Sequence, residues 1–427
     1  MKLIKLVILI FGWVAHGQHY WQAVPNITPN GSSQRFDDVF FLNENTGWAA
    51  NGAFATVYKT TDGGLTWTEQ LNESDLTGDF YFRNIQFLNE NIGFLGTVYS
   101  PNGLFKTSDG GDNWVAVNNI TPSPGAICGL ATIGNSTIYG CGAFNEPAYI
   151  IKSTDSGSSW SYTDMSLHAT ALVEVTFISE LIGYAAGKST TGATVLKTID
   201  GGTTWNEVYN SNISGEYVWK LQVLDSDNDV LFGAVYTSAP NPGKLISSSN
   251  AGLNWNSYDA PESGVQAVGF INENTGWMGG HDTGFYETTN GGQSWTNLNI
   301  GSNLNRIFIL SSGTAFGSGT TIYKFTSESL STQNFEDNYQ GNPLAINLAN
   351  NPIRNTLRFT IDFNGADNIL INLYDIQGKL LRRLTREIIM DSTKKEYAFD
   401  VKELSEGTYI IDFHNNLGRI SKKFIKL

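Results

Sequence analysis

The sequence contains few cysteines, few histidines and little positive charge. Two cysteines in 427 residues cannot hold together a small, disulfide-dense fold. Five histidines without ligand-like spacing form no zinc or catalytic motif, so we predict no metal site and no cofactor. With 26 Lys and Arg against 40 Asp and Glu, the net charge is −14. Nucleic-acid binding depends on clustered Lys and Arg, so we predict no nucleic-acid partner.

Long hydrophobic runs are also lacking. One run, over residues 6–15, follows the basic segment Met1–Lys5 and is well below the roughly 20 residues that span a bilayer. With the small residues after it, this run predicts a signal peptide over residues 1–17, with cleavage before Gln18. The alternative is a short membrane anchor. We therefore expect no transmembrane span in the mature chain, and a secreted or cell-surface protein that is exported via the periplasm.

The two cysteines, Cys128 and Cys141, lie on adjacent apolar runs separated by the Gly-Asn-Ser of residues 134–136. A hairpin there would bring their side chains opposite each other, and an exported protein can form disulfides. A register shift of one residue would instead leave two small buried thiols. The sequence leaves both outcomes open.

Glycine and aromatic residues are abundant, at 45 Gly and 12 % Phe, Trp and Tyr, and they recur in the pattern Ser/Thr-x-Asp-x-Gly-x-x-Trp. An Asp or Asn side chain can bond the backbone N–H groups of its own turn, and glycine supplies the positive φ that a tight turn needs. Each copy therefore predicts a strand–turn–strand corner whose Trp opens the next strand as an apolar wedge. The structural residues of the six copies are Asp62 and Trp67, Asp109 and Trp114, Asp155 and Trp160, Asp200 and Trp205, Asn250 and Trp255, and Asn290 and Trp295.

The spacing of the corners indicates a ring of repeats. Successive corner Trp residues are 47, 46, 45, 50 and 40 residues apart, a period typical of propellers. Trp21 lies 46 residues before Trp67 without a corner of its own, and residues 306–326 contain three strand-like runs without a fourth. The two fragments complete each other. We therefore predict an all-β fold over residues 18–326, a seven-bladed β-propeller in which the N-terminal strand closes the last blade.

Each repeat is expected to hold four strands, called A to D from the ring axis outward. In the first repeat they cover residues 38–42, 47–52, 56–61 and 66–70. The connections from D to the next A and from B to C vary most, and in a propeller they share one face while the corners lie on the other. Variable loops on a rigid scaffold usually carry function, so we expect binding on the face with the D–A and B–C loops.

The chain changes character after residue 326. Residues 327–344 are rich in Ser, Thr, Gln, Asn and Asp without apolar periodicity, which predicts a linker. Residues 345–427 contain six strand-like runs, enough for a small β-sandwich. Residues 18–326 carry 27 acidic and 11 basic side chains, net −16, whereas residues 345–427 carry 10 and 13, net +3.

The corners resemble the Asp-box, or BNR, repeats of sialidase-type propellers. The Gly-Trp-Ala of residues 47–49, followed by Lys-Thr-Thr-Asp-Gly-Gly-Leu-Thr-Trp at residues 59–67, is more similar to photosystem II stability/assembly factor-like propellers. Six corners make this a strong signal for architecture. Such propellers include hydrolases, assembly factors and binding proteins, so the resemblance by itself assigns no function.

Four further motifs follow in order near the C-terminus. They are Asn-Pro-Ile-Arg-Asn-Thr-Leu at 351–357, Leu-Tyr-Asp-Ile-Gln-Gly-Lys at 373–379, Leu-Ser-Glu-Gly-Thr-Tyr-Ile at 404–410 and Lys-Phe-Ile-Lys at 423–426. Together they resemble the C-terminal sorting domain of type IX secretion cargo. The resemblance implies a Bacteroidetes-like source, passage through the outer membrane, and the type IX secretion machinery as a partner of residues 345–427.

Three arginines form the best candidate constellation for a ligand. Arg35, Arg83 and Arg306 each lie at or just before the start of a strand A, in repeats one, two and seven, which are neighbours in a closed ring. In sialidases, which the repeats resemble, three arginines hold a carboxylate and a Tyr activated by a Glu attacks. Here no Tyr–Glu pair can be assigned, so we name no catalytic residue.

The surroundings of the arginines leave two interpretations open. Asp37 and Asp38 either pair with Arg35 or are solvated loop charges, and the three arginines either converge on a ligand or form separate ion pairs. Aromatic residues near the starts of strands A either stack on a sugar or pack between blades. The candidate ligand-binding residues are Arg35, Arg83, Arg306, Tyr81, Tyr217 and Trp219.

We therefore predict a secreted, non-catalytic propeller that binds a protein or glycan partner through its D–A and B–C face. The alternative is a glycoside hydrolase, sialidase-like or xyloglucanase-like. Carboxylates converging in a deep pocket would favour the hydrolase, whereas a rim of aromatic residues and arginines would favour the binding protein.

Overall fold

The computed structural model describes residues 19–427, apart from residues 32–33, 77, 99–102, 143–146, 225–226, 239, 328–329, 331–344, 350, 364–366, 376–379, 391–392 and 416–417. The expected signal peptide and most of the expected linker lie outside the described residues. The chain divides into two compact units, which meet in the sequence at Leu330 and Ser331. Within the described part, no helix is long and apolar enough to cross a membrane.

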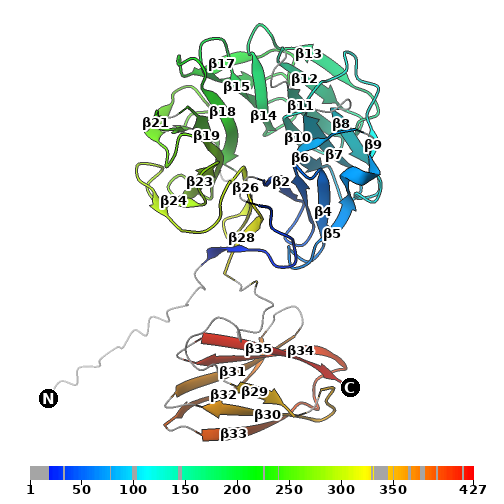
Figure 1. Cartoon of the computed structure of the whole chain (residues 1–427), viewed down its shortest axis with the longest axis vertical. Coiled ribbons are helices and arrows are strands. Elements are labelled where there is room, and N and C mark those ends of the chain that lie inside the picture. The colour runs from blue at the N-terminus through cyan, green and yellow to red at the C-terminus, as the bar shows by residue number, and fades with distance from the viewer. Residues whose placement is uncertain are drawn as a thin grey trace, which may run out of the picture. The chain divides into compact units, whose positions relative to one another are not determined.

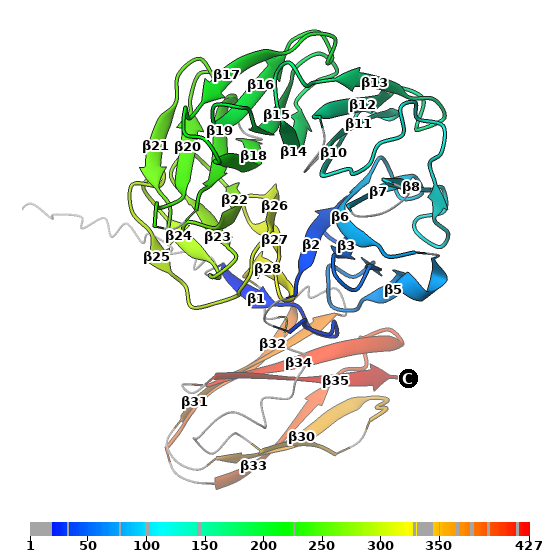
Figure 2. The same cartoon turned by 45° about the horizontal axis from the view of Figure 1, so that its top comes forward.

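The first unit contains seven four-stranded antiparallel sheets among its described residues, and they are arranged around a ring (Figures 1 and 2). In the first sheet the strands from the axis outward are β2 (Phe36–Phe41), β3 (Gly47–Asn51), β4 (Thr56–Thr60) and β5 (Thr68–Leu71). These bounds agree within two residues with the strands A to D expected from the sequence. The unit is therefore all-β, as expected.

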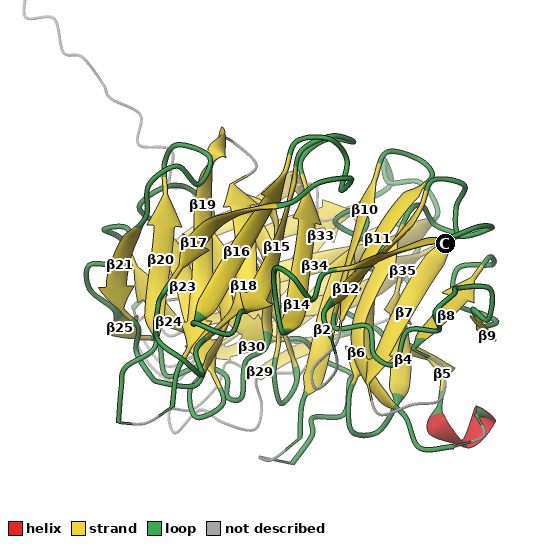
Figure 3. Cartoon of the chain, turned by 90° about the horizontal axis from the view of Figure 1, so that it is seen from above, coloured by secondary structure: helices red, strands yellow, loops and turns green. Residues whose placement is uncertain are grey.

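Five further sheets repeat the same order of strands. They are β6 (Tyr81–Phe87), β7 (Gly93–Val98), β8 (Leu104–Thr107) and β9 (Val115–Ala116); β10 (Gly129–Ile133), β11 (Thr137–Gly142), β12 (Tyr149–Ser153) and β13 (Ser161–Asp164); β14 (Ala171–Phe177), β15 (Gly183–Lys188), β16 (Ala193–Thr198) and β17 (Asn206–Asn210); β18 (Tyr217–Leu224), β19 (Asp227–Tyr236), β20 (Lys244–Ser248) and β21 (Asn256–Asp259); and β22 (Val265–Phe270), β23 (Gly276–Gly280), β24 (Tyr286–Thr288) and β25 (Thr296–Asn297). In the described part, the one helical element is a short 3-10 turn, η1 (Glu73–Asp75), red in Figure 3.

The last sheet joins the two ends of this unit. Strands β26 (Arg306–Ser311), β27 (Thr314–Ser318) and β28 (Ile322–Thr326) are completed by β1 (Tyr20–Ala23), which pairs antiparallel with β28. The expected pairing of the N-terminal strand with this sheet is therefore present. Trp21 on β1 is 2 % exposed, and its ring stacks on Phe285, directly before β24 of the preceding sheet, with centroids 4.0 Å apart. The closing strand thus also packs on a neighbouring sheet.

Aromatic stacking between neighbouring sheets explains a glycine that recurs at the start of strand B. Phe41 at the end of β2 stacks on Phe316 of β27 with ring centroids 3.4 Å apart, and Phe87 at the end of β6 stacks on Trp48 of β3 at 3.5 Å. A Cβ atom on Gly47 would lie 2.5 Å from the Phe41 ring. Glycine is needed there because the ring of its own sheet fills that space. The same relation holds for Gly93, Gly183 and Gly276 with Phe87, Phe177 and Phe270.

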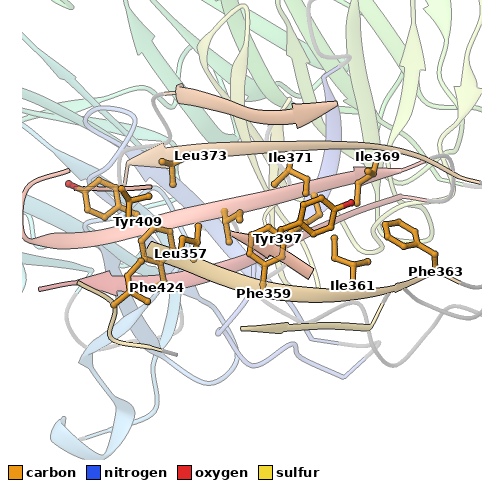
Figure 4. Close-up of a cluster of buried hydrophobic side chains, with 14 of the residues drawn as sticks. Leu357, Phe359, Ile361, Phe363, Ile369, Ile371, Leu373, Tyr397, Tyr409 and Phe424 are labelled. Carbon is orange, nitrogen blue, oxygen red and sulfur yellow. The ribbon is translucent and has the colours of Figure 1, made fainter. Parts of the chain in front are cut away.

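The second unit holds two antiparallel sheets. One contains β29 (Ala345–Leu348), β30 (Thr356–Phe363) and β33 (Thr393–Asp400), and the other contains β32 (Leu380–Ile389), β31 (Asp367–Asp375), β34 (Gly407–Asn415) and β35 (Gly418–Lys426). Apolar residues alternate along β30 and β31, so one face of each strand is buried. The two sheets share a single core that includes Phe359, Ile371, Tyr397 and Phe424 (Figure 4).

The first and last of the four C-terminal motifs lie side by side. The Ile353 N–H donates to the Ile425 carbonyl at 2.8 Å, and the Leu427 N–H donates to the Ile353 carbonyl at 2.8 Å. The Asn351 carboxamide oxygen accepts from the Ile425 N–H at 2.8 Å. Residues 351–353 therefore extend the pairing at the end of β35, which ties the two ends of this unit together.

Candidate functional site

The six repeated corners are built from hydrogen bonds within each turn. In the first, the Thr60 hydroxyl donates to Asp62 at 2.9 Å and accepts from the Gly64 N–H at 2.9 Å. Asp62 also accepts from the Thr66 N–H at 2.8 Å and from the Thr66 hydroxyl at 2.6 Å. Gly64 has φ of 90°, a conformation that favours glycine. Every partner of the carboxylate lies within four residues, so the corner is a local structure.

The two corners with Asn keep the same geometry. Asn250 accepts from the Ser248 hydroxyl at 3.0 Å and from the Asn254 N–H at 2.9 Å. In the Asp corners, hydrogen bonds to the ionised form lower the carboxyl pKa, to about 2 at Asp200. Five of the corner Trp side chains are half-buried, and only Trp205, at 5 % exposed, is fully buried. The expected apolar wedge is therefore partly open to solvent in most repeats.

A second repeated feature, which sequence reasoning missed, lies in the inner strands. Five of them contain a β-bulge at their second or third residue, where the pairing with strand B skips one position. A bulge leaves one residue without a ladder partner and can turn its side chain to a new direction. The five extra residues are Asp37, Arg83, Val173, Trp219 and Gln266. We call them the bulge ring.

Members of the bulge ring contact one another across the axis. Arg83 Nη1 lies 2.6 Å from Asp37 Oδ1, and the Arg83 guanidinium lies 5.1 Å from the centroid of the Trp219 ring. Arg35, just before β2, lies 3.3 Å from the same Asp37 oxygen and donates to Gln266. Two of the three candidate arginines therefore share one carboxylate. The interpretation of Asp37 as a solvated loop charge is wrong, because its side chain is fully buried by these partners.

Aromatic side chains cover this network. Tyr81, Tyr217 and Tyr236, all half-buried, pack with Trp219 in one cluster. The Trp219 indole N–H donates to Asn305 at 3.1 Å. Burial raises the pKa of the Tyr81 hydroxyl, and Asp37 adds to this effect, so the group stays protonated at neutral pH. The three candidate aromatic residues thus lie together.

Arg306 belongs to a different set of ion pairs. Its Nη1 lies 2.8 Å from Glu174 Oε1 and its Nε lies 3.6 Å from Asp38 Oδ1. Lys220 Nζ lies 2.7 Å from the other Glu174 oxygen. Asp38, 1 % exposed, also accepts from the Val39 N–H, so the solvated-loop interpretation is wrong for Asp38 too.

The two carboxylates beside Arg306 have opposite pKa shifts. Burial raises the pKa of Asp38 more than its cationic neighbours lower it. Burial also raises the pKa of Glu174, but Arg306 and Lys220 together outweigh it and the pKa lies below its ordinary value. Sequence reasoning missed Glu174 and Lys220. No residue type marks them in the sequence, although in the structure Asp38, Glu174 and Lys220 each come directly after a bulge residue.

A cavity of about 340 Å³ lies beside this second set. All seven inner strands line it, mostly through their later residues, such as Phe40 of β2 and Phe177 of β14. The bulge ring lies near the start of the same strands. Glu174 and Lys220, which directly follow bulge residues, line the cavity, so the cavity begins next to the bulge ring.

The two cysteines lie one position out of register. Cys141 is opposite Gly129, and the Cys128 N–H donates to the Cys141 carbonyl at 2.7 Å. Both thiols are buried and free, and burial raises the pKa of Cys128 to about 11. Of the two outcomes left open by the sequence, two free thiols is the observed one.

Two family models match the chain. Residues 16–163 match the family described as photosynthesis system II assembly factor YCF48, and residues 351–427 match a secretion system C-terminal sorting domain. Both resemblances identified in the sequence are confirmed. A sorting domain of this kind implies secretion or export to the cell surface. A search of curated proteins finds no match.

Solved structures with the same architecture are distant in sequence. YCF48 bound to a D1 peptide is 20 % identical with a TM-score of 0.55, over 74 % of this chain and 99 % of that one. The WD40 β-propeller domain of Doa1 is 14 % identical, TM-score 0.52, over 73 % and 98 %. An ancestral GH74 enzyme is 13 % identical, TM-score 0.55, over 94 % and 63 %. At these identities the likeness establishes a β-propeller fold and nothing more.

Proposed function

We propose that this protein is a secreted, non-catalytic seven-bladed β-propeller. It binds a protein partner at the bulge ring together with Arg35 and the tyrosines packed around Trp219. The observation that carries the proposal is the gathering of Tyr81, Tyr217 and Trp219 with Arg35 and Arg83 at the start of the inner strands. Half-exposed tyrosines over buried guanidinium groups combine apolar contact area with hydrogen-bond donors, a combination typical of binding surfaces.

The domain organisation follows from the same proposal. Residues 1–17 are a signal peptide, 18–326 the propeller, 327–344 a linker and 345–427 a small β-sandwich that acts as the sorting domain. The seven four-stranded sheets and the pairing of β1 with β28 support the blade count and the closure. The single core shared by the two C-terminal sheets supports the sandwich.

A protein partner is favoured over a glycan by two considerations. YCF48, which has the same fold, is bound to a D1 peptide in one solved structure. The D–A connections lead directly into the strands that carry the bulges, so the candidate residues lie on the face where the loops vary in length. A partner segment with acidic or carbonyl groups would meet Arg35 and Arg83 below the tyrosines.

The charges near the axis argue against a glycoside hydrolase. Such enzymes need one carboxylic acid and one carboxylate that face the same sugar. Asp37 is paired with Arg35 and Arg83, and Glu174 is paired with Arg306 and Lys220. Of the three acids near the axis, Asp37, Asp38 and Glu174, only Glu174 lines the cavity. This arrangement supports a binding role.

The test compares the mature chain with a double variant, Tyr81→Ala/Tyr217→Ala, on a peptide array and a glycan array. We expect peptides to bind and the double variant to lose most of that binding. Tyr258→Ala, a half-buried tyrosine on the outer strand β21, is the matched control and should bind as the parent does. Binding of glycans in place of peptides, or unchanged binding by a folded double variant, would contradict the proposal.

The sorting function is tested separately by deleting residues 345–427. We expect the truncated chain to keep its partner binding and to accumulate in the periplasm of its native host. Continued secretion of the truncated chain would show that these residues are not the export signal.

A further inference from the structure

The buried charges around Asp37 do not balance. Arg35 and Arg83 are 8 % and 5 % exposed, and both lie against the same Asp37 oxygen. Within the described part of the chain, neither guanidinium group has a second carboxylate at ion-pair distance. One positive charge at this place is therefore uncompensated, and an uncompensated buried charge is costly.

The excess charge is confined to these two arginines. The other buried cations near the axis, Arg306 and Lys220, are matched by two carboxylates, Asp38 and Glu174. An anionic group that is attracted to the axis would therefore bind at Arg35 and Arg83 and not at the second set of ion pairs.

One terminal nitrogen of Arg83 also lacks a hydrogen-bond partner. Its Nη1 donates to Asp37 at 2.6 Å, whereas its Nη2 is buried and has no acceptor among the described residues. Nearly all buried donors in folded proteins are satisfied, so this one needs an explanation. A guanidinium group presents its N–H donors as a planar fork that suits the oxygens of a carboxylate. The unused edge of Arg83 thus fits an acceptor that the chain itself does not supply.

A further cation lies at the same end of the sheets. Lys188, the last residue of β15, is opposite Ala171, the first residue of β14, so it lies at the end where the inner strands begin. Its Nζ is 4.4 Å from the centroid of the Tyr217 ring. The half-buried Tyr81 and Tyr217 therefore have cations both below them and beside them.

We propose that the site takes one carboxylate of the partner, held by Arg83 beneath Tyr81 and Tyr217. This inference rests on the proposed function and specifies which group of the partner is recognised. The carboxylate accepts from Arg83 Nη2 and offsets the excess charge beside Asp37, while Lys188 attracts it toward the site. Entry needs a rotamer change of the tyrosines, a kind of change that is common at interfaces.

The charge of the site limits the partner to a single carboxylate. The deficit is one negative charge, and a phosphate group, at about −1.5 to −2, would exceed it. The surrounding propeller is strongly acidic, so further acidic groups on the partner would be repelled. The carboxylate is therefore one Asp or Glu side chain, or one chain terminus, with apolar neighbours that pack on the tyrosine rings.

The experiment measures the binding of four N-acetylated tripeptides to the mature chain at neutral pH by calorimetry. Phe-Glu-Phe amide presents a side-chain carboxylate, and Phe-Ala-Phe with a free C-terminus presents a terminal one. Phe-Gln-Phe amide is the neutral match, and Phe-Lys-Phe amide reverses the charge. We expect at least one acidic probe to bind about tenfold more tightly than the glutamine probe, because a charge-assisted hydrogen bond is lost with the amide. The acidic probe that binds identifies the source of the carboxylate.

Variants locate the carboxylate within the site. Arg83→Met removes the excess charge but leaves Arg35 paired with Asp37, so it should bind the acidic and glutamine probes equally. Lys106→Met, a half-buried lysine on β8, removes the same charge elsewhere and should keep the preference. If Arg83→Met does not fold, Lys188→Met at the half-buried rim should reduce the preference by roughly twofold to fivefold.

Several results would overturn the proposal. Equal binding of the acidic and glutamine probes by the parent would remove any role for a carboxylate, and so would the absence of binding by all four probes. Tighter binding of the lysine probe would assign the site to cations. A preference that persists in folded Arg83→Met, or is unchanged in Lys188→Met, would place the carboxylate elsewhere. The proposed function fails on a different result, unchanged peptide binding by Tyr81→Ala/Tyr217→Ala, so the two failures can be distinguished.

Discussion

The corners and the bulge ring hold their aspartates in opposite ways. Asp62 in a corner takes its hydrogen-bond partners from residues within four positions, and its side chain is half-buried. Asp37 in the bulge ring is fully buried, and its shortest contact is to Arg83, which is 46 residues away. A turn held by its own residues can recur in every repeat. An ion pair between sheets depends on which residue each neighbouring sheet supplies, so it does not recur.

This difference should appear in the free energies of unfolding of variants at the two places. A surface carboxylate held by its own turn is partly satisfied by water when a bond is lost. A buried carboxylate shared by two guanidinium groups has no such replacement, and its removal leaves two buried cations without a counter-charge. Changes at the bulge ring are therefore expected to cost more than changes in any corner.

The largest effect is expected for Asp37→Ala. Loss of the shared carboxylate leaves Arg35 and Arg83 buried together, which should destabilise the first unit by about 3–5 kcal/mol. Denaturant unfolding of the mature chain measures the loss. A decrease below about 1 kcal/mol would mean that the buried pairs resemble surface pairs, and the comparison with the corners would fail.

The next largest difference in stability is expected between variants of two tryptophans. Trp21→Ala removes a buried ring from the closing strand and should cost about 3–5 kcal/mol. Trp160→Ala in a corner should cost less, because its ring is half-buried. Equal losses in denaturant unfolding would show that the corner Trp contributes as much as the closing strand, contrary to their burial.

A smaller effect is expected inside a corner. In Thr198→Val the Gly202 N–H loses its acceptor and Asp200 loses a donor, which should cost about 1–2 kcal/mol. Thr203→Val, whose exposed hydroxyl donates to the Asp200 carbonyl, is the control and should be close to neutral. If both variants unfold at the same denaturant concentration, the repeated Ser/Thr is not needed for the turn.

The smallest effect concerns pH. The folded-state pKa of Asp200 is about 2, below the roughly 3.9 of an unfolded chain. A lowered folded pKa means that this contribution is present above about pH 4 and is lost as the pH falls toward 2. Asp200→Asn, which copies the Asn found in two corners, should show a shallower fall in melting temperature between pH 4 and pH 2. Parallel curves for variant and parent would contradict the assignment.

Sequence patterns were sufficient for the strands and corners, because these depend on residues close together in the chain. The four strands of the first repeat were predicted within two residues, from apolar alternation and from the fixed spacing of Asp62 and Trp67. The register of the cysteine hairpin could not be predicted, since a shift of one residue leaves the local pattern unchanged.

The centre of the ring was predicted only in part. The arginines were recognised by their place before strands A, and Asp37 was one of their possible partners. The bulges, which set the direction of each side chain, have no marker in residue type: the five extra residues are as different as Asp, Val and Trp. Glu174 and Lys220 lie on strands that sequence reasoning did not bring together with Arg306.

The amino-acid sequence alone determined the repeat and the C-terminal sorting motifs, because each is a short pattern whose physics is complete within a few residues. The closing strand followed from counting repeats, since Trp21 lies one period before Trp67 and the last repeat lacks a strand. The tertiary structure alone decided which charges meet at the axis. A carboxylate can pair with any nearby cation, and only the packing of seven sheets brings Asp37 to Arg83 and Glu174 to Arg306. Spatial neighbours 46 and 132 residues apart are set by that packing and not by local pattern.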